Sequence, residues 1–166
     1  TSVGGGPFPT ELTGEAGDRV RKKGAEFAAS TGRPRRCGWF DSVVVRYSCM
    51  VNHVNTLVIT KLDVLDALDE IQVCTGYRHE GRELESFPMS IDLLEQVEPV
   101  YESHPGWKTP TAGLRRFNEL PVEAKAYLSR LSELLSTDIA IVSTGPDREE
   151  TIFRDDSPYR EMLGLN

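Results

Sequence analysis

Residues 56–63 read Thr-Leu-Val-Ile-Thr-Lys-Leu-Asp, a short apolar run that ends in a polar turn. Such a run is typical of a buried strand that leads into a turn. Residues 139–145 repeat the arrangement, because Ile-Ala-Ile-Val is followed directly by Ser-Thr-Gly. Ligands in open α/β sheets bind just beyond the carboxyl ends of strands. We therefore interpret the two turns together, as candidate ligand-contacting segments.

Helices and strands are predicted along the whole chain, which indicates an α/β fold. Residues 15–23 are expected to form a short charged helix closed by Gly24 as a C′ glycine. Asp41 is a good N-cap for a second helix. Pro121 begins a third helix, which is amphipathic. The apolar face of that helix is made of Ala124, Tyr127, Leu128, Leu131, Leu134 and Leu135.

An antiparallel hairpin region is expected between the two polar turns. Residues 71–77 and 82–87 flank His79-Glu80-Gly81, which predicts two strands joined by a tight turn. A further strand is expected at 97–101. The tail after Phe153 is charged and is expected to be loose.

Length and composition describe an ordinary globular chain of 166 residues, with 39% hydrophobic and 27% charged residues. The net charge of -7 argues against nucleic-acid binding, which needs a basic field. No apolar run approaches the roughly 18 residues needed to span a bilayer. We therefore expect neither a nucleic acid nor a membrane as a partner. Wide spacing of the three cysteines predicts reduced thiols, with no disulfide framework and no zinc pattern.

A concentrated positive segment at 28–39 contrasts with this negative charge. Three of its residues are arginines within four positions: Arg33, Arg35 and Arg36. Their guanidinium groups are forked donors suited to carboxylate and phosphate. Pro34 favours an extended backbone, which would place Arg33 and Arg35 on one side and Arg36 on the other. The segment predicts a local anion site, and a solvated basic loop is the alternative.

The turn at 60–63 has the residues to recognise guanine. The carboxylate of Asp63 can accept two parallel hydrogen bonds, from N1–H and the exocyclic amine, whereas adenine offers no such donor pair. The methylene stem of Lys61 can lie across the purine. In the second turn, free backbone amides and Gly145 can lie against an oxygen of a flat ligand. The alternatives are a solvated turn and a plain exit from a strand.

Five motifs occur along the chain in a fixed order: VGGGPFPTE (3–11), STGRPRRCGWFD (30–41), TKLDVLD (60–66), YE…PGW (101–107) and STGPDR (143–148). In this order and at these separations they resemble adenylosuccinate synthetase, from Val3 to about Ile152. The resemblance implies the C-terminal part of a P-loop-NTPase-like enzyme with a mixed or parallel sheet, to which the hairpin region is added. It assigns residues 1–153 to that region and leaves 154–166 as the loose tail. The implied reaction condenses IMP with L-aspartate, driven by GTP, to give adenylosuccinate, GDP and phosphate.

The resemblance also implies roles for individual residues. Thr31 and Arg33 hold the carboxylates of L-aspartate, Val3 and Arg33 line the IMP site, and Arg35 faces the phosphates and ribose of GTP. The L-aspartate loop comprises Ala29, Ser30, Thr31, Gly32, Arg33, Pro34 and Arg35. The other GTP-binding residues are Lys61, Leu62, Asp63, Ser143, Thr144 and Gly145. Pro34 is a departure, because some relatives have a basic residue there, and it changes the stiffness and charge of the loop.

The catalytic groups implied by the resemblance are expected upstream of Thr1. The family's glycine-rich Gly-Asp-Glu-Gly-Lys-Gly-Lys segment carries the catalytic aspartate and a Mg²⁺ ligand, and it has no counterpart in these 166 residues. We therefore expect no catalytic residue and no metal ligand in this chain, and no synthetase activity of the chain alone.

The resemblance further implies a cytoplasmic homodimer. A non-catalytic module that binds a guanine nucleotide or a partner protein is the alternative function. An independent GTPase is disfavoured, because no phosphate-binding loop occurs.

Overall fold

The computed structural model of the chain describes residues 1–154 and divides them into two compact units. Unit 1 comprises Thr1–Tyr47 and Gln72–Ser103, and unit 2 comprises Ser48–Ile71 and residues 104–154. The elements are α1 (Gly14–Lys23), β1 (Phe40–Asp41), α2 (Ser42–Val51), β2 (Thr56–Ile59), the 3-10 turn η1 (Leu62–Leu65), β3 (Glu70–His79), β4 (Arg82–Glu83), α3 (Ile91–Leu94), β5 (Glu98–Pro105), the 3-10 turn η2 (Phe117–Glu119), α4 (Val122–Leu135), β6 (Asp138–Ser143) and β7 (Thr151–Phe153). The expected α/β class is confirmed.

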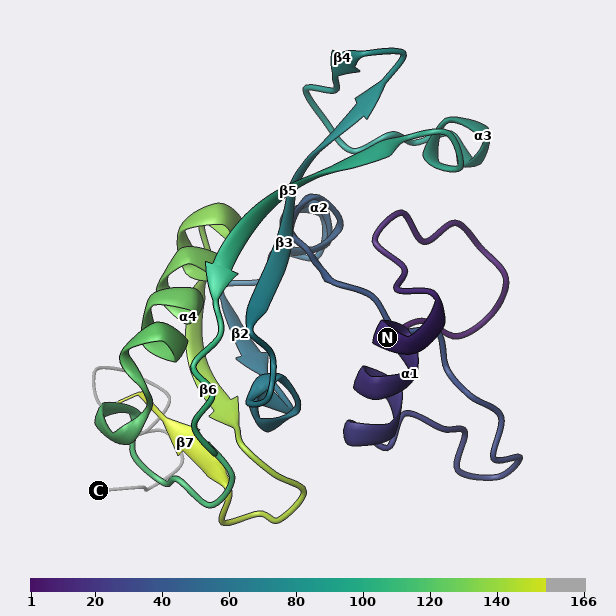
Figure 1. Ribbon diagram of the computed structural model, residues 1–166. Helices are drawn as coiled ribbons and strands as arrows, with labels where there is room; N and C mark the ends of the chain where they lie inside the picture. Colours follow the sequence, from purple (N-terminus) through teal and green to yellow (C-terminus); the bar gives the residue numbers. More distant parts are fainter. Residues whose placement is uncertain (155–166) are drawn as a thin grey trace. The chain divides into compact units, whose positions relative to one another are not determined.

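The sheet of unit 2 has the strand order β2-β6-β7, in which β2 runs parallel and β7 antiparallel to β6 (Figure 1). Helix α4 contacts β6 and lies alongside it. Strand β6 buries Ile139, Ala140 and Val142, and α4 buries the apolar face predicted for it, except that Leu134 is only half-buried. Burial of these side chains from the strand and the helix gives unit 2 its apolar core.

The two outer strands of unit 2 differ from the prediction. Strand β2 is half-buried rather than buried, because among the described residues it pairs only with β6, and its Val58 is 52% exposed. Strand β7 was not expected, since three residues give too short a pattern to recognise. It forms because Ile152 is fully buried and pairs with Val142 of β6.

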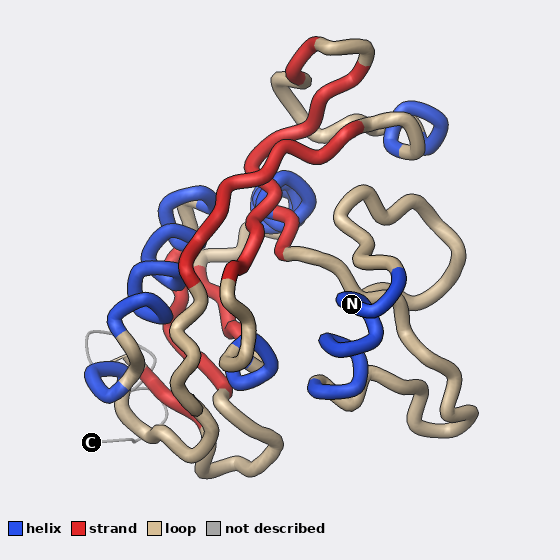
Figure 2. The backbone as a smooth tube through the Cα atoms, in the orientation of Figure 1, coloured by secondary structure: helices blue, strands red, loops and turns tan. Residues whose placement is uncertain are grey.

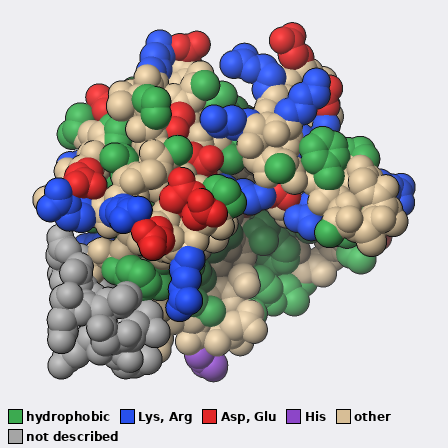
Figure 3. Space-filling model, turned by 90° about the horizontal axis from the view of Figure 1, so that it is seen from below, with side chains coloured by type: hydrophobic (Ala, Val, Ile, Leu, Met, Phe, Trp, Pro, Cys, Tyr) green, Lys and Arg blue, Asp and Glu red, His purple; other side chains and the backbone are tan. Residues whose placement is uncertain are grey.

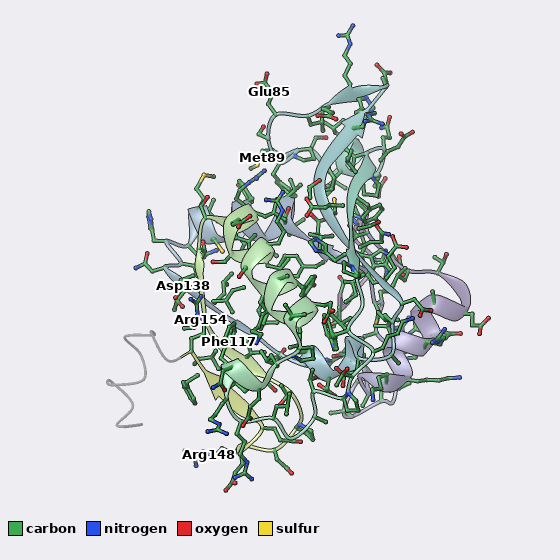
Figure 4. The ribbon with its side chains drawn as sticks, turned by 60° about the vertical axis from the view of Figure 1, so that its left-hand side comes forward. Glu85, Met89, Phe117, Asp138, Arg148 and Arg154 are labelled. Atoms are coloured by element: carbon green, nitrogen blue, oxygen red, sulfur yellow. The ribbon has the colours of Figure 1, made fainter. Side chains whose placement is uncertain are left out.

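Arg154 fastens the end of the described chain to unit 2. Its N–H donates to the carbonyl of Ala140 at 3.0 Å. Its guanidinium pairs with Asp138 at 2.9 Å and lies 5.6 Å from the ring centre of Phe117, and Figure 4 shows the three side chains together. The rest of the loose tail expected after Phe153, residues 155–166, lies outside the described residues.

The sheet of unit 1 is built around the long strand β3. Strand β1 pairs with it in parallel, β4 pairs with it through the predicted tight turn, and β5 pairs with it as well (Figure 2). The second hairpin strand ends at Glu83 and does not reach residue 87 as predicted. Phe87 packs instead against the core of this unit and stacks on Tyr47 at 4.8 Å between ring centres. Packing of Phe87 in this core is therefore favoured over a longer pairing of β4 with β3.

Asp41 caps α2 as predicted. Its Oδ1 accepts the amides of Val43 and Val44 at 3.1 and 3.2 Å, while Oδ2 accepts the hydroxyl of Tyr77 at 2.6 Å. Burial raises the pKa of this carboxyl, and these hydrogen bonds oppose the rise. One side chain thus fixes both the start of the helix and its attachment to β3.

Helix α1 ends at Lys23 as predicted, but Gly24 is not its C′ residue. Gly24 is the C-cap with a φ of -81°, and the left-handed C′ residue is Ala25, with a φ of 50°. The amide of Glu26 donates to the carbonyl of Arg21 at 2.9 Å, and that of Ala25 to Lys22 at 3.2 Å. This pair of bonds is a Schellman motif, which satisfies the last carbonyls despite the side chain at C′.

A buried carboxylate in unit 2 explains the spacing between two of the sequence motifs. Asp66, which ends the motif TKLDVLD, accepts the indole N–H of Trp107 at 2.7 Å. It also accepts the hydroxyl and the amide of Thr111, each at 2.8 Å. All three residues are buried. The carboxylate therefore joins the turn after β2 to the segment after β5.

We expect Asp66→Ala to lower the free energy of unfolding by about 3–5 kcal/mol, because each buried donor left without an acceptor costs roughly 1–3 kcal/mol. Thermal or denaturant unfolding measures the change. The matched control is Asp69→Ala, since Asp69 is exposed and pairs with the exposed Lys108. That change should stay below about 1 kcal/mol. Equal effects of the two substitutions would contradict the role of Asp66.

Candidate functional site

The two polar turns lie side by side in unit 2. Ile59 of β2 pairs with Val142 of β6 in a parallel ladder, so both strands end at the same edge of the sheet. The turn at 60–63 follows β2 directly, and the turn at 143–145 begins at Ser143, the last residue of β6. The structure therefore brings together the two segments that the sequence analysis interpreted as one site.

The turn after β2 is fixed by its backbone and by one buried side chain. Lys61 adopts a left-handed conformation with a φ of 60°, and η1 begins at the next residue. Leu62 is buried and anchors the turn within unit 2, whereas Lys61 is exposed and Asp63 is half-buried. Leu62 can therefore offer a ligand only its backbone, while Lys61 and Asp63 can offer side chains.

The turn after β6 is less open than predicted. The amide of Thr144 is not free, because it donates to the carbonyl of Glu150 at 2.9 Å. The hydroxyl of buried Thr144 lies 3.2 Å from the carbonyls of both Leu114 and Glu150. Ser143 donates its hydroxyl to the carbonyl of Gly145 at 2.8 Å. Within residues 1–154 this leaves the amide of Gly145 and the oxygen lone pairs of Ser143 for a ligand.

The predicted L-aspartate loop is a closed turn in unit 1. Phe27 and Pro34 form an antiparallel bridge, and the amide of Ala28 donates to the carbonyl of Arg33 at 2.8 Å. The amide of Gly32 returns to the carbonyl of Ala28 at 2.8 Å, which the φ of 65° at this glycine allows. Residues 29–34 are all exposed. The loop thus presents its predicted binding residues to solvent.

Two of the three arginines are held by carboxylates of unit 1. Arg35 pairs with the buried Glu26 at 3.0 Å. Arg36 pairs with Glu11 at 2.5 Å and donates to the carbonyl of Gly6 at 2.6 Å. The hydrogen bond from Arg36 lowers the pKa of Glu11 below its ordinary value. Arg36 therefore secures the glycine-rich opening of the chain.

Arg33 differs from both neighbours, because within residues 1–154 its side chain is exposed and forms no ion pair. Val3 lies near this segment through a bridge between Ser2 and Arg36, and it is 84% exposed. The candidate residues thus fall into two groups. Val3 and the arginine loop belong to unit 1, and the two polar turns belong to unit 2.

The sequence does not indicate the acidic residues that organise both groups. Glu11 and Glu26 hold arginines in unit 1, and Glu150 holds the turn after β6 in unit 2. Nothing in their local patterns distinguishes them from the exposed acids of the chain. Only the tertiary contacts reveal them.

On the face drawn in Figure 3, Lys and Arg side chains are interspersed with Asp and Glu side chains. Residues 1–154 contain no group of three or more His, Cys, Asp or Glu side chains placed to hold a metal ion. Over the same residues, every helix is too short or too polar to cross a bilayer.

Comparisons with known proteins point to one family. A family model described as adenylosuccinate synthetase matches residues 1–152. The chain is 52% identical over 164 residues to the adenylosuccinate synthetase of Solibacter usitatus, covering 99% of this chain and 38% of that protein. It is 54% identical over 155 residues to that of Desulforapulum autotrophicum, covering 93% and 36%.

A solved structure gives the same result for the fold. The fully ligated adenylosuccinate synthetase from Plasmodium falciparum superposes with a TM-score of 0.88 at 39% sequence identity. The match covers 92% of this chain and 37% of that one. The chain thus spans less than two fifths of the length of each of these relatives.

Proposed function

Because the chain belongs to the adenylosuccinate synthetase family, we propose that it is part of an enzyme that joins IMP to L-aspartate with GTP, giving adenylosuccinate, GDP and phosphate. In this proposal the chain supplies the L-aspartate loop and the residues that recognise guanine. The observation that carries it is the parallel register of β2 and β6, which sets the two polar turns at one edge of a sheet.

The guanine base is proposed to bind between these turns. Asp63 accepts hydrogen bonds from N1–H and the exocyclic amine, and the stem of Lys61 covers one face of the purine. The amide of Gly145 and the hydroxyl of Ser143 contact the base from the neighbouring strand end. Thr144 supports this turn through its buried hydroxyl, and Leu62 contributes backbone only.

The L-aspartate loop is proposed to bind anions through the arginine that has no carboxylate partner among the described residues. Arg33 binds a carboxylate of L-aspartate and also contacts IMP, with Thr31 and the exposed loop around it, Ala29 to Pro34. Val3 lines the IMP site. Arg35 faces the phosphates and ribose of GTP, with Glu26 holding its guanidinium.

Several features are proposed from the family resemblance alone. They are a relation to P-loop NTPases, use of Mg²⁺, assembly as a homodimer and action in the cytoplasm. The described residues offer no cluster of three or more side chains suited to a metal. The catalytic aspartate and the metal ligands are proposed to lie outside these 166 residues.

We expect the isolated chain of residues 1–166 to form no adenylosuccinate from IMP, L-aspartate and GTP, while the complete protein does. The reason is that the proposed catalytic groups are absent from the isolated chain. Chromatographic detection of the product, with both proteins at equal concentration, measures the difference. Turnover by the isolated chain would show that catalytic groups lie within it. A complete protein without turnover that still binds GDP would favour the alternative of a binding module.

A further inference from the structure

The turn after β6 is shaped by one residue of the loop that follows it. The carbonyl of Glu150 accepts the amide of Thr144 at 2.9 Å and lies 3.2 Å from the hydroxyl of Thr144. Its carboxylate accepts the amide of Asp147 at 3.0 Å. Backbone and side chain of one residue thus close the loop from both ends. Arg148 lies in the same loop and is labelled in Figure 4.

The same carboxylate lies against Gly145. A Cβ placed on Gly145 would stand 2.1 Å from Oε2 and 2.5 Å from Oε1 of Glu150, closer than real Cβ contacts allow. The φ of Gly145 is not in the left-handed region, so the backbone itself would accept a side chain. Glycine leaves this space to the carboxylate of Glu150, and a larger residue would have to displace the end of that side chain.

The neighbouring acid is bound differently. Glu149 pairs with Arg115 at 2.8 Å, and both side chains are largely exposed. Such a pair contributes about 0–1 kcal/mol. Glu149 and Glu150 carry the same charge in the same loop, but only Glu150 contacts the turn at 143–145 in the described structure.

We propose that Glu150 is a positioning residue for recognition of the purine base. It acts through Gly145, whose amide it fixes at the edge of the sheet where the base of a guanine nucleotide binds. The inference rests on the function proposed above and adds a specificity-determining residue that touches no substrate. Among the described residues, hydrogen bonds join Glu150 to Thr144 of this turn and to Asp147 of its own loop, so its effect should be confined to nucleotide binding.

The experiment uses the complete protein with Glu150→Ala, Glu150→Gln and the control Glu149→Ala. Its readouts are GDP affinity by calorimetry and the KM values for GTP, IMP and L-aspartate. Glu150→Ala should weaken GDP binding and raise the KM for GTP about tenfold, because the net contribution of about one hydrogen bond to positioning the turn is lost. The KM values for IMP and L-aspartate should not change. Glu150→Gln, whose amide oxygen can still accept from Asp147, should restore GDP binding, and Glu149→Ala should match wild type.

A second pair of variants separates positioning from loss of folding. Gly145→Ala should weaken GDP binding in the wild-type background by no more than Glu150→Ala does, because its methyl group displaces the carboxylate of Glu150 from the amide of Asp147. In the Glu150→Ala background the same substitution should cost little more, since the space has been vacated. Additive losses would overturn the inference, as would equal increases in all three KM values. If wild-type protein binds no GDP and forms no product, the proposed function fails and this inference fails with it.

Discussion

Replacing Asp63 with Asn in the complete protein is expected to raise the KM for GTP by about 10²-fold, since hydrogen bonds to a charged group contribute roughly 1.5–3 kcal/mol each. The carboxylate can accept from two donors of guanine at once. An amide offers one acceptor oxygen and sets an N–H group against the second donor, which leaves that donor unpaired. Initial rates with varied GTP at saturating IMP and L-aspartate measure the change.

The same variant should lose selectivity as well as affinity. Inosine triphosphate lacks the exocyclic amine, so the wild-type protein should prefer GTP to it, and the preference should shrink strongly in Asp63→Asn. The control is Asp69→Asn, because Asp69 is exposed and pairs with the exposed Lys108. An unchanged KM for GTP with unchanged discrimination would place the guanine site elsewhere.

Replacing Arg33 with Ala is expected to raise the KM for L-aspartate by about 10²-fold or more, the loss typical when a carboxylate is deprived of its charged partner. Thermal stability should hardly change, because the side chain is exposed and forms no ion pair within residues 1–154. Steady-state kinetics with varied L-aspartate, together with a melting curve, measures both. Arg33→Lys should recover only part of the affinity, since an ammonium cannot form the forked pair.

The control for Arg33 is Arg19→Ala, which removes the same charge from an exposed position on α1. It should leave the KM for L-aspartate unchanged. A similar increase in both variants would show that the effect comes from overall charge rather than from binding at Arg33.

Much of the fold follows from local sequence signals. The Asp41 cap, the tight turn at 80–81 and the apolar face of the helix from Pro121 are short-range patterns, and the structure contains each of them. The strands at 56–59 and 138–143 are predicted from the sequence as two similar strand ends, but their pairing with each other is not. The prediction failed where tertiary contacts prevail, as at Phe87, which packs in a core, and at the three-residue strand β7.

The candidate site was predictable to a similar degree. A position at the end of a predicted strand indicates Lys61, Asp63 and the turn at 143–145 as candidate site residues. The parallel register of β2 and β6 then places the two turns together. The chemistry of the arginine segment did not reveal which of its guanidinium groups are already engaged. Arg35 and Arg36 meet Glu26 and Glu11, which are distant in sequence or unremarkable locally. Contacts of that kind leave no periodic pattern from which they can be predicted.

The guanine site between the two strand ends is tested most directly by a crystal structure of the complete protein with GDP bound. The account predicts the base at the carboxyl ends of β2 and β6. The carboxylate of Asp63 should lie within hydrogen-bond distance of both N1 and the exocyclic amine, and the amide of Gly145 should face the base. A base bound away from these turns, or one whose donors meet a different carboxylate, would contradict it.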